Sequence, residues 1–137
     1  MRRYVMDTSA WIEYLRGSKQ GVRIKNLIRP VGRVVVVITP TMVLAEMRKH
    51  YIEKKLDGFE TDLETVRGLS DEIPVLDEVT ALLAGKIRAE ERDDDLSLTD
   101  CVLIAIATAT GAKVISTDTD FKGRPQAIYV GIPRDRV

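Results

Sequence analysis

The sequence predicts a three-layer α/β/α domain built on a mostly parallel sheet of four to five strands. Short runs of β-branched residues recur along the chain and are apolar throughout, which is typical of strands buried on both faces of a parallel sheet. Helical patterns separate these runs, as the right-handed crossovers of a parallel sheet require. The chain has 137 residues, of which 45% are hydrophobic, so we expect one domain over residues 1–137 with a core of its own.

The strands are predicted from the composition of short segments and from the residues that bound them. The expected strands occupy residues 3–6, 34–38, 113–117 and 127–130. The second of these contains only valine and isoleucine. A weaker fifth candidate lies at 73–76, where Pro74 lacks an N–H group and would restrict the segment to a sheet edge.

Three helices are expected in the first part of the chain. An apolar stripe that includes Trp11 ends at Gly17, and a second stripe ends before Pro30. A third helix has an explicit start, because Thr39 can cap it while Pro40 occupies its first position.

Three more helices are expected before the third strand. Apolar residues at helical spacing occur over 59–66 and again over 79–87, where Val79, Leu82, Leu83 and Ile87 form the predicted buried face. The last helix, over 98–110, is apolar nearly all round and stops at Gly111, so we expect it to be fully buried.

Composition excludes several classes of protein. Cys101 is the only cysteine, so there is no intramolecular disulfide and no pair of thiolates for a zinc finger. His50 is the only histidine, which excludes two-histidine mechanisms within one chain. No nucleotide-binding glycine motif occurs, no apolar run approaches the roughly 18 residues that span a bilayer, and Asp7 interrupts any signal peptide. We therefore expect a cytoplasmic protein without a membrane partner.

Opposite charges balance overall but are unevenly distributed. Residues 1–55 carry 12 Lys and Arg against 4 Asp and Glu, a net of +8, whereas residues 56–100 carry 4 against 14, a net of −10. The basic part suggests an anionic partner such as nucleic acid, and solvated helix faces whose charges intermix on folding are the alternative.

Four carboxylates are expected to meet at one edge of the sheet. Asp7 and Asp118 each follow a predicted strand directly, and Glu46 lies about two turns into the helix after the second strand. Asp100 begins the helix that leads into the third strand, and that helix runs antiparallel to the strand. All four therefore point to the carboxyl ends of the strands, where sites in such sheets lie.

A cluster of this kind favours a metal ion. Two like charges about 4 Å apart repel by about 4 kcal/mol at an effective dielectric constant of 20. Four carboxylates must therefore become protonated, move apart or hold a cation. Because the ligands are all oxygen, hard cations such as Mg²⁺ or Mn²⁺ are favoured, and such an ion can activate water against a phosphodiester.

Each acidic residue also has an interpretation that involves no ligand. Asp7 can cap the helix that follows it, and Asp100 completes an S-x-x-D capping box. Glu46 borders the apolar face of its helix, and Asp118 and Asp120 lie in a turn-forming sequence. Their coincidence at one edge of the sheet argues against these separate explanations.

The four acidic positions and their neighbours carry a family resemblance. The sequence resembles PIN-domain ribonucleases, and specifically the VapC toxins of type II toxin–antitoxin pairs. The matching segments are Val5-Met6-Asp7-Thr8-Ser9, Thr39-Pro40 leading to Leu44-Ala45-Glu46, Leu96-Ser97-Leu98-Thr99-Asp100 and Val114-Ile115-Ser116-Thr117-Asp118-Thr119-Asp120-Phe121. They occur in order, at the expected separations, over essentially the whole chain.

The resemblance implies a metal-dependent endoribonuclease that hydrolyses RNA to a 5′-phosphate and a 3′-hydroxyl. It assigns Asp7, Glu46, Asp100 and Asp118 to the acidic quartet that binds Mg²⁺ or Mn²⁺. Asp120 matches a further acidic position of the family and is a secondary candidate for a metal ligand. It also implies an RNA substrate, a VapB-like antitoxin whose tail covers the site, and a homodimer or toxin–antitoxin hetero-oligomer. Ser116 stands where the family usually has threonine, and its hydroxyl can still orient a carboxylate.

Two other functions stay open at this level. One is a PIN-fold nuclease with a housekeeping role in RNA processing and no antitoxin. The other is a non-catalytic interaction module whose acidic residues only cap helices. Outside the motifs, we interpret His50 as a surface helix residue, Trp11 as core, Cys101 as an inert buried thiol and the Asp93-Asp94-Asp95 run as a solvated loop.

Overall fold

Four parallel strands form the centre of the molecule. The computed structural model describes residues 1–92 and 95–131, and its sheet has the order β2-β1-β3-β4. Every neighbouring pair is parallel. The strands are β1 (Arg2–Met6), β2 (Val35–Ile38), β3 (Lys113–Ser116) and β4 (Ala127–Tyr129). The four main expected strands are thus confirmed, each to within one residue at either end.

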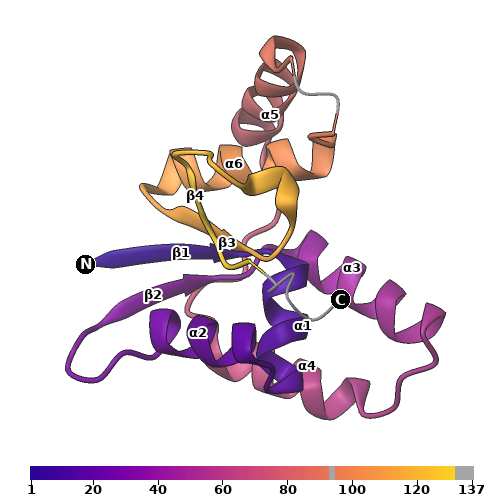
Figure 1. Cartoon of the computed structure of the whole chain (residues 1–137). Helices are drawn as coiled ribbons and strands as arrows, with labels where there is room; N and C mark the ends of the chain where they lie inside the picture. Colours follow the sequence, from indigo (N-terminus) through magenta and orange to yellow (C-terminus); the bar gives the residue numbers. More distant parts are fainter. Residues whose placement is uncertain (93–94, 132–137) are drawn as a thin grey trace.

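Helices cover both faces of this sheet. Figure 1 shows α5 and α6 on one side and α1 to α4 on the other, which confirms the α/β class with three layers. The helices are α1 (Thr8–Arg16), α2 (Lys19–Ile28), α3 (Thr41–Glu53), α4 (Phe59–Leu69), α5 (Glu78–Glu90) and α6 (Leu98–Thr110), with a 3₁₀ turn η1 (Thr119–Phe121) before β4. No helix among the described residues is long and apolar enough to cross a membrane.

The fifth candidate strand is not formed. The chain before this segment reaches the end of β2 in a single parallel bridge between Ile38 and Glu72, and residues 73–76 continue beyond the last residue of that strand. The backbone N–H of Thr41 still donates to the carbonyl of Pro74. Pro74 has no N–H to return, so the pairing does not extend into a ladder.

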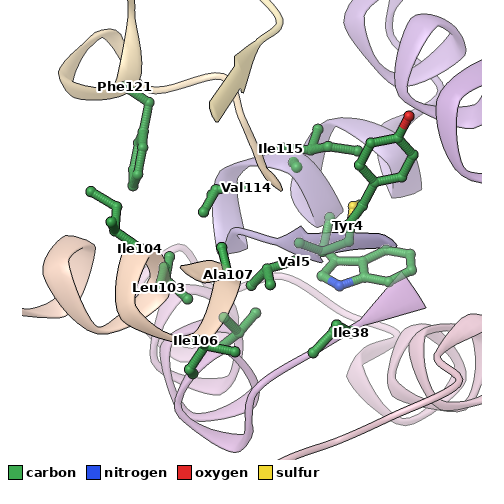
Figure 2. Packing of buried hydrophobic residues seen from close by; sticks show 14 of the residues in the cluster. Tyr4, Val5, Ile38, Leu103, Ile104, Ile106, Ala107, Val114, Ile115 and Phe121 are labelled. Atoms are coloured by element: carbon green, nitrogen blue, oxygen red, sulfur yellow. The ribbon is translucent and has the colours of Figure 1, made fainter. Parts of the chain in front are cut away.

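The core lies where α6 packs on the sheet. All residues of α6 from Cys101 to Ala107 are buried. Figure 2 shows Ile104 of this helix near Val114 of β3, with Phe121 of the 3₁₀ turn pointing toward it. The expected fully buried helix is confirmed, and burial raises the pKa of the Cys101 thiol, consistent with an unreactive cysteine.

The start of α3 differs from the expectation. The cap residue is Pro40, with no side-chain hydrogen bond to the helix, and the helix begins at Thr41. Thr39 is fully buried and its hydroxyl accepts from the indole N–H of Trp11 at 3.1 Å and pairs with the Ser70 hydroxyl at 2.7 Å. Tertiary hydrogen bonds therefore replace the expected cap, and the buried Trp11 confirms its interpretation as core.

The outer face of α5 also differs from the expectation. Val79 and Leu82 are 79% and 70% exposed, although both belong to the predicted apolar face. Leu83 and Ile87 of the predicted face do pack against the core, together with the buried residues Thr80 and Ala84 on the side of α5 that contacts α6. The position of α5 at the outside of the layer leaves part of its apolar surface uncovered.

The sheet winds in two directions from its centre. The connection from β1 to β2 runs through α1 and α2. The connection from β2 to β3 runs through α3 to α6 and places β3 on the opposite side of β1 from β2. The carboxyl ends of β1 and β3 therefore lie side by side at the point where the strand order reverses. Ligand sites of open α/β sheets form at this point.

Candidate active site

Asp7 occupies the carboxyl end of β1 and is almost completely buried. Its backbone N–H donates to the carbonyl of Ile115 at 3.0 Å and so extends the pairing of β1 with β3. Its carboxylate is satisfied on both oxygens. Oδ1 accepts the backbone N–H of Thr8 at 2.7 Å, and Oδ2 accepts the hydroxyls of Ser116 at 2.7 Å and Ser9 at 3.0 Å.

Burial changes the acidity of this carboxyl group. It raises the pKa of Asp7 from 3.8 to about 6, mainly because the charged form loses water. Hydrogen bonds from Ser116, Ser9 and Thr8 act in the opposite direction, and the negative charge of Glu46 adds to the rise. The site therefore holds an anion that solvent alone does not stabilise.

Thr8 connects two of the expected acidic residues. While its backbone N–H binds Asp7, its hydroxyl donates to Glu46 Oε1 at 2.9 Å. Glu46 lies in the second turn of α3, so this contact joins the start of α1 to α3. The structure thus brings Asp7 and Glu46 together.

Ser116 connects Asp7 to the end of β3. Its fully buried hydroxyl donates to Asp7 and accepts the backbone N–H of Asp118 at 3.0 Å. The Ser9 hydroxyl accepts the next N–H, that of Thr117, at 3.1 Å. The structure confirms that the Ser116 hydroxyl orients a carboxylate, and it shows that this carboxylate belongs to Asp7.

Asp100 lies at the start of α6, near the end of β3. Its carboxylate accepts the backbone N–H of Ser97 at 3.0 Å, and its own N–H donates to the Ser97 hydroxyl at 3.0 Å, which completes a capping box. Burial raises the pKa of Asp100, the Ser97 hydrogen bonds lower it, and the charge of Asp118 raises it. Arg124 lowers it, as expected of a nearby cation.

Asp118 and Asp120 complete this second group. Asp118 Oδ1 accepts the backbone N–H of Asp120 at 3.0 Å and so caps the 3₁₀ turn. Desolvation raises the pKa of Asp120, and the charges of Asp118, Asp100 and Asp95 raise it further. The expected acidic residues are therefore brought together as two groups, Asp7 with Glu46 and Asp100 with Asp118 and Asp120, joined through Ser116.

The capping interpretation is correct for three of these residues. Asp7, Asp100 and Asp118 each cap a helix or a 3₁₀ turn with one carboxylate. A carboxylate has about four lone-pair positions, so capping and ligand binding are compatible at one residue.

The donor chemistry of these groups fits a hard divalent cation. All the available ligands are carboxylate oxygens. Desolvation, with a smaller contribution from neighbouring negative charges, raises the pKa values of Asp7, Asp100 and Asp120, and a bound cation would stabilise their charged forms. Among residues 1–92 and 95–131, however, no three His, Cys, Asp or Glu side chains converge in an arrangement that could hold a metal ion. The metal site predicted from the sequence thus stays a prediction.

Three further residues shape the site without having been assigned a role from the sequence. Thr8 and Ser9 belong to the motif around Asp7, and two hydroxyl residues directly after a strand-end aspartate are the signal that would have identified them. Arg124 forms an ion pair with Glu91 at 2.8 Å and donates from Nε to the carbonyl of Asp120 at 2.7 Å. Only the fold brings this cation to the acidic residues.

The remaining predictions near the site have mixed outcomes. His50 lies on α3, half-buried, one turn after Glu46. Asp93 and Asp94 of the acidic run lie outside the described residues, whereas Asp95 is exposed.

The fold and the position of the acidic residues define the class of protein. It is an α/β protein with a carboxylate-lined site at the switch point of its sheet. Residues 4–125 match the family model of the PIN domain, and the chain belongs to this family. No curated protein matches the chain.

Solved structures share this fold over nearly the whole chain. A toxin–antitoxin complex from Klebsiella pneumoniae has a TM-score of 0.69 at 18% identity, covering 94% of this chain and 99% of that one. VapC20 from Mycobacterium tuberculosis, a toxin that cleaves the sarcin–ricin loop, has a TM-score of 0.68 at 18% identity, with coverages of 90% and 95%. DNA-bound VapBC from Salmonella typhimurium has 0.61 at 22% identity, with coverages of 94% and 97%. At these sequence identities, the similarity shows a shared fold alone.

Proposed function

We propose that this protein is a Mg²⁺- or Mn²⁺-dependent endoribonuclease and the toxin of a VapBC-type pair. The observation that carries the proposal is the presence of two neighbouring acidic groups, Asp7 with Glu46 and Asp100 with Asp118, linked through Ser116 at the carboxyl ends of β1 and β3. Membership of the PIN family and the similarity in fold to VapC toxins support it.

The residues have different tasks in this proposal. Asp7 and Asp118, at strand ends, would hold the divalent ion, and Asp100 and Glu46 would complete its ligand set from helices. The ion, when bound, activates water and neutralises charge on the phosphodiester. Ser9 and Ser116 keep the Asp7 carboxylate oriented through hydrogen bonds. Asp120 is a secondary candidate for a metal ligand.

The partners belong to the same proposal. They are RNA as substrate, a VapB-like antitoxin that covers the site, and a second copy of the chain, all in the cytoplasm. Light scattering of the purified protein should show a dimer, and the mass of a monomer would exclude the second copy.

The function is tested by RNA cleavage with purified protein. A structured RNA is incubated with Mg²⁺, with Mn²⁺ or with EDTA, and Asp7→Asn is purified alongside to expose contaminating ribonuclease. We expect cleavage that requires metal and disappears in the variant. Equal cleavage by the variant would exclude Asp7 from the mechanism.

The non-catalytic interaction module is the second candidate, since three of the acidic residues do cap helices or turns. It predicts neither cleavage nor metal binding. Isothermal titration with Mn²⁺ separates the two, because a nuclease with a very selective substrate still binds the ion. A housekeeping nuclease is recognised by cleavage without an antitoxin gene beside its own.

A further inference from the structure

A cavity of about 550 Å³ lies between α1 and α3, beside the acidic site. It is lined by Ile12, Arg16, His50, Tyr51, Lys54 and Leu56. The two helices lie next to each other on the same side of the sheet (Figure 1). A volume of this size is within the range of ligand pockets.

The cavity continues directly from the acidic site. Thr8 of α1 binds Glu46 of α3, and positions four and eight residues further along both helices line the cavity. Residues four apart share one helix face and are about 6 Å apart along the axis. A ligand that fills the cavity therefore extends from Arg16 and Lys54 toward Glu46.

The lining combines cations with apolar surface. Lys54 has no ion pair within the part of the chain that the structure describes, and Arg16, which is 69% exposed, contacts only Glu13 at 3.2 Å. Since a guanidinium has five N–H donors, Arg16 can bind an anion while it keeps this contact. Ile12, Tyr51 and Leu56 supply the apolar surface, and the Tyr51 hydroxyl is already bound to Asp62.

Charge explains why the occupant should be a nucleotide. The acidic site repels a polyanion, so a phosphodiester needs nearby cations to reach it. Arg16 and Lys54 lie on one side of the acidic site, two helical turns along the cavity from Thr8 and Glu46. Tyr51 and the apolar side chains beside it offer a surface to the face of a base, and proteins bind single-stranded nucleic acid with cations along the backbone and aromatic side chains against the bases.

We propose that this cavity binds a nucleotide of single-stranded RNA that flanks the cleaved bond. Arg16 and Lys54 contact its phosphates, and Leu56 and Ile12 contact its base. The inference rests on the proposed function for the position of the cleaved bond. Its test measures binding alone, so that it can fail or succeed independently of cleavage.

The experiment measures RNA binding in the Asp7→Asn background with EDTA present. A fluorescent single-stranded oligoribonucleotide of mixed sequence is titrated, and its anisotropy is followed at several salt concentrations. Arg16→Gln with Lys54→Gln removes the two cations from the cavity. Arg23→Gln with Lys55→Gln is the matched control, because it removes the same charges from exposed positions outside the cavity.

We expect the cavity variant to weaken binding on the order of tenfold more than the control. The slope of log affinity against log salt should fall in magnitude by about 1.4, at roughly 0.7 for each lost phosphate contact. Equal effects of the two double variants would overturn the proposal. Circular dichroism should show the same melting temperature for both, since the substituted side chains are exposed.

Leu56→Ala tests the contact with the base. It should weaken binding of the RNA and leave binding of the same oligomer with abasic positions unchanged, whereas equal effects on both would overturn the base contact. An apolar acidic peptide that loses affinity to the cavity variant, while RNA does not, would identify a protein-docking groove instead. If the cavity variant loses RNA affinity while the parent protein neither cleaves RNA nor binds Mn²⁺, the cavity is supported and the nuclease is rejected.

Discussion

Asp7 and Asp118 follow neighbouring parallel strands, yet their surroundings differ. Asp7 belongs to a closed half of the site, in which Thr8, Ser9 and Ser116 hold a carboxylate that is only 8% exposed. Asp118 belongs to an open half, with Asp100 and Asp120, where its exposed carboxylate accepts the backbone N–H of Asp120.

This difference separates two ways of building an acidic site. In the closed half, hydrogen bonds from hydroxyl groups keep a buried carboxylate in one orientation despite the loss of water. In the open half, capping of α6 and of the 3₁₀ turn holds the backbone, and solvent reaches the carboxylates. Substitutions in the closed half should therefore affect both stability and activity, and substitutions in the open half mainly activity.

The largest contrast is expected in cleavage by Asp7→Asn and Asp120→Asn. Asp7→Asn should lower kcat/KM on the order of 1,000-fold, or about 4 kcal/mol, because Asp7 is a proposed metal ligand. Asp120→Asn should lower kcat/KM less than tenfold, since Asp120 is only a secondary candidate for a metal ligand. Single-turnover cleavage of one RNA by both purified variants measures this. Equal losses would show that the two halves do not differ in their importance for catalysis.

Asp7→Asn should also leave the fold intact. Its amide oxygen can accept from Thr8, and its NH₂ can donate to the hydroxyls of Ser9 and Ser116, which rotate to accept. Circular dichroism of the variant provides this control for the cleavage experiment.

The second contrast is the dependence of stability on pH without metal. The pKa of Asp7 is about 6 in the folded protein and 3.8 as an ordinary carboxyl group. The folded state therefore binds more protons between about pH 4 and pH 6, so this residue makes the free energy of unfolding fall as pH rises through that window. At 1.36 kcal/mol per pH unit, the loss is about 3 kcal/mol.

Urea unfolding at pH 4 and pH 7 in EDTA measures this loss. Asp7→Asn has no titrating group at this position. The free energy of unfolding of the variant, relative to that of the parent protein, should therefore be higher at pH 7 than at pH 4 by about the same amount. Asp100 and Asp120 act in the same direction in both proteins, since their pKa values are raised as well. A constant difference across pH would contradict the buried, desolvated state of Asp7.

The third contrast concerns the hydroxyl that joins the halves. Ser116→Ala removes a hydrogen bond to the Asp7 carboxylate and leaves the Asp118 N–H without its acceptor, which should cost about 2 kcal/mol in the free energy of unfolding. The cost should be smaller at pH 4, where Asp7 is protonated. Ser116→Thr keeps the hydroxyl and is the control, and an equal cost for both variants would point to packing instead.

The smallest effect is expected from metal binding to the native protein. At ten times its Kd, Mg²⁺ or Mn²⁺ should stabilise the fold by about 1.4 kcal/mol, which raises Tm by roughly 4 °C for a chain of this size. Asp118→Asn should abolish this shift, while Glu78→Gln, an exposed charge on α5, should keep it. Unchanged melting in the native protein would reject a strong metal site.

Local patterns were sufficient for most of the fold. The apolar β-branched runs, Gly17 and Gly111 as helix ends, and the apolar α6 all correspond to elements of the structure. The expectations that failed depend on what lies across from a residue. Thr39 binds Trp11 instead of capping α3, and Val79 lies on an outer surface although its spacing suits a core.

The amino-acid sequence alone places Asp7 and Asp118 at the carboxyl ends of parallel strands, because apolar β-branched runs mark the strands and helical segments connect them. It also determined that Asp100 begins a buried helix, because α6 is apolar nearly all round. The contacts by which Thr8 and Ser116 join these carboxylates, and the position of Arg124 beside Asp100, follow from tertiary packing. Hydrogen bonds and burial depend on groups far apart in the chain, such as Ser116 and Asp7 at a separation of 109 residues, and only folding brings those groups together.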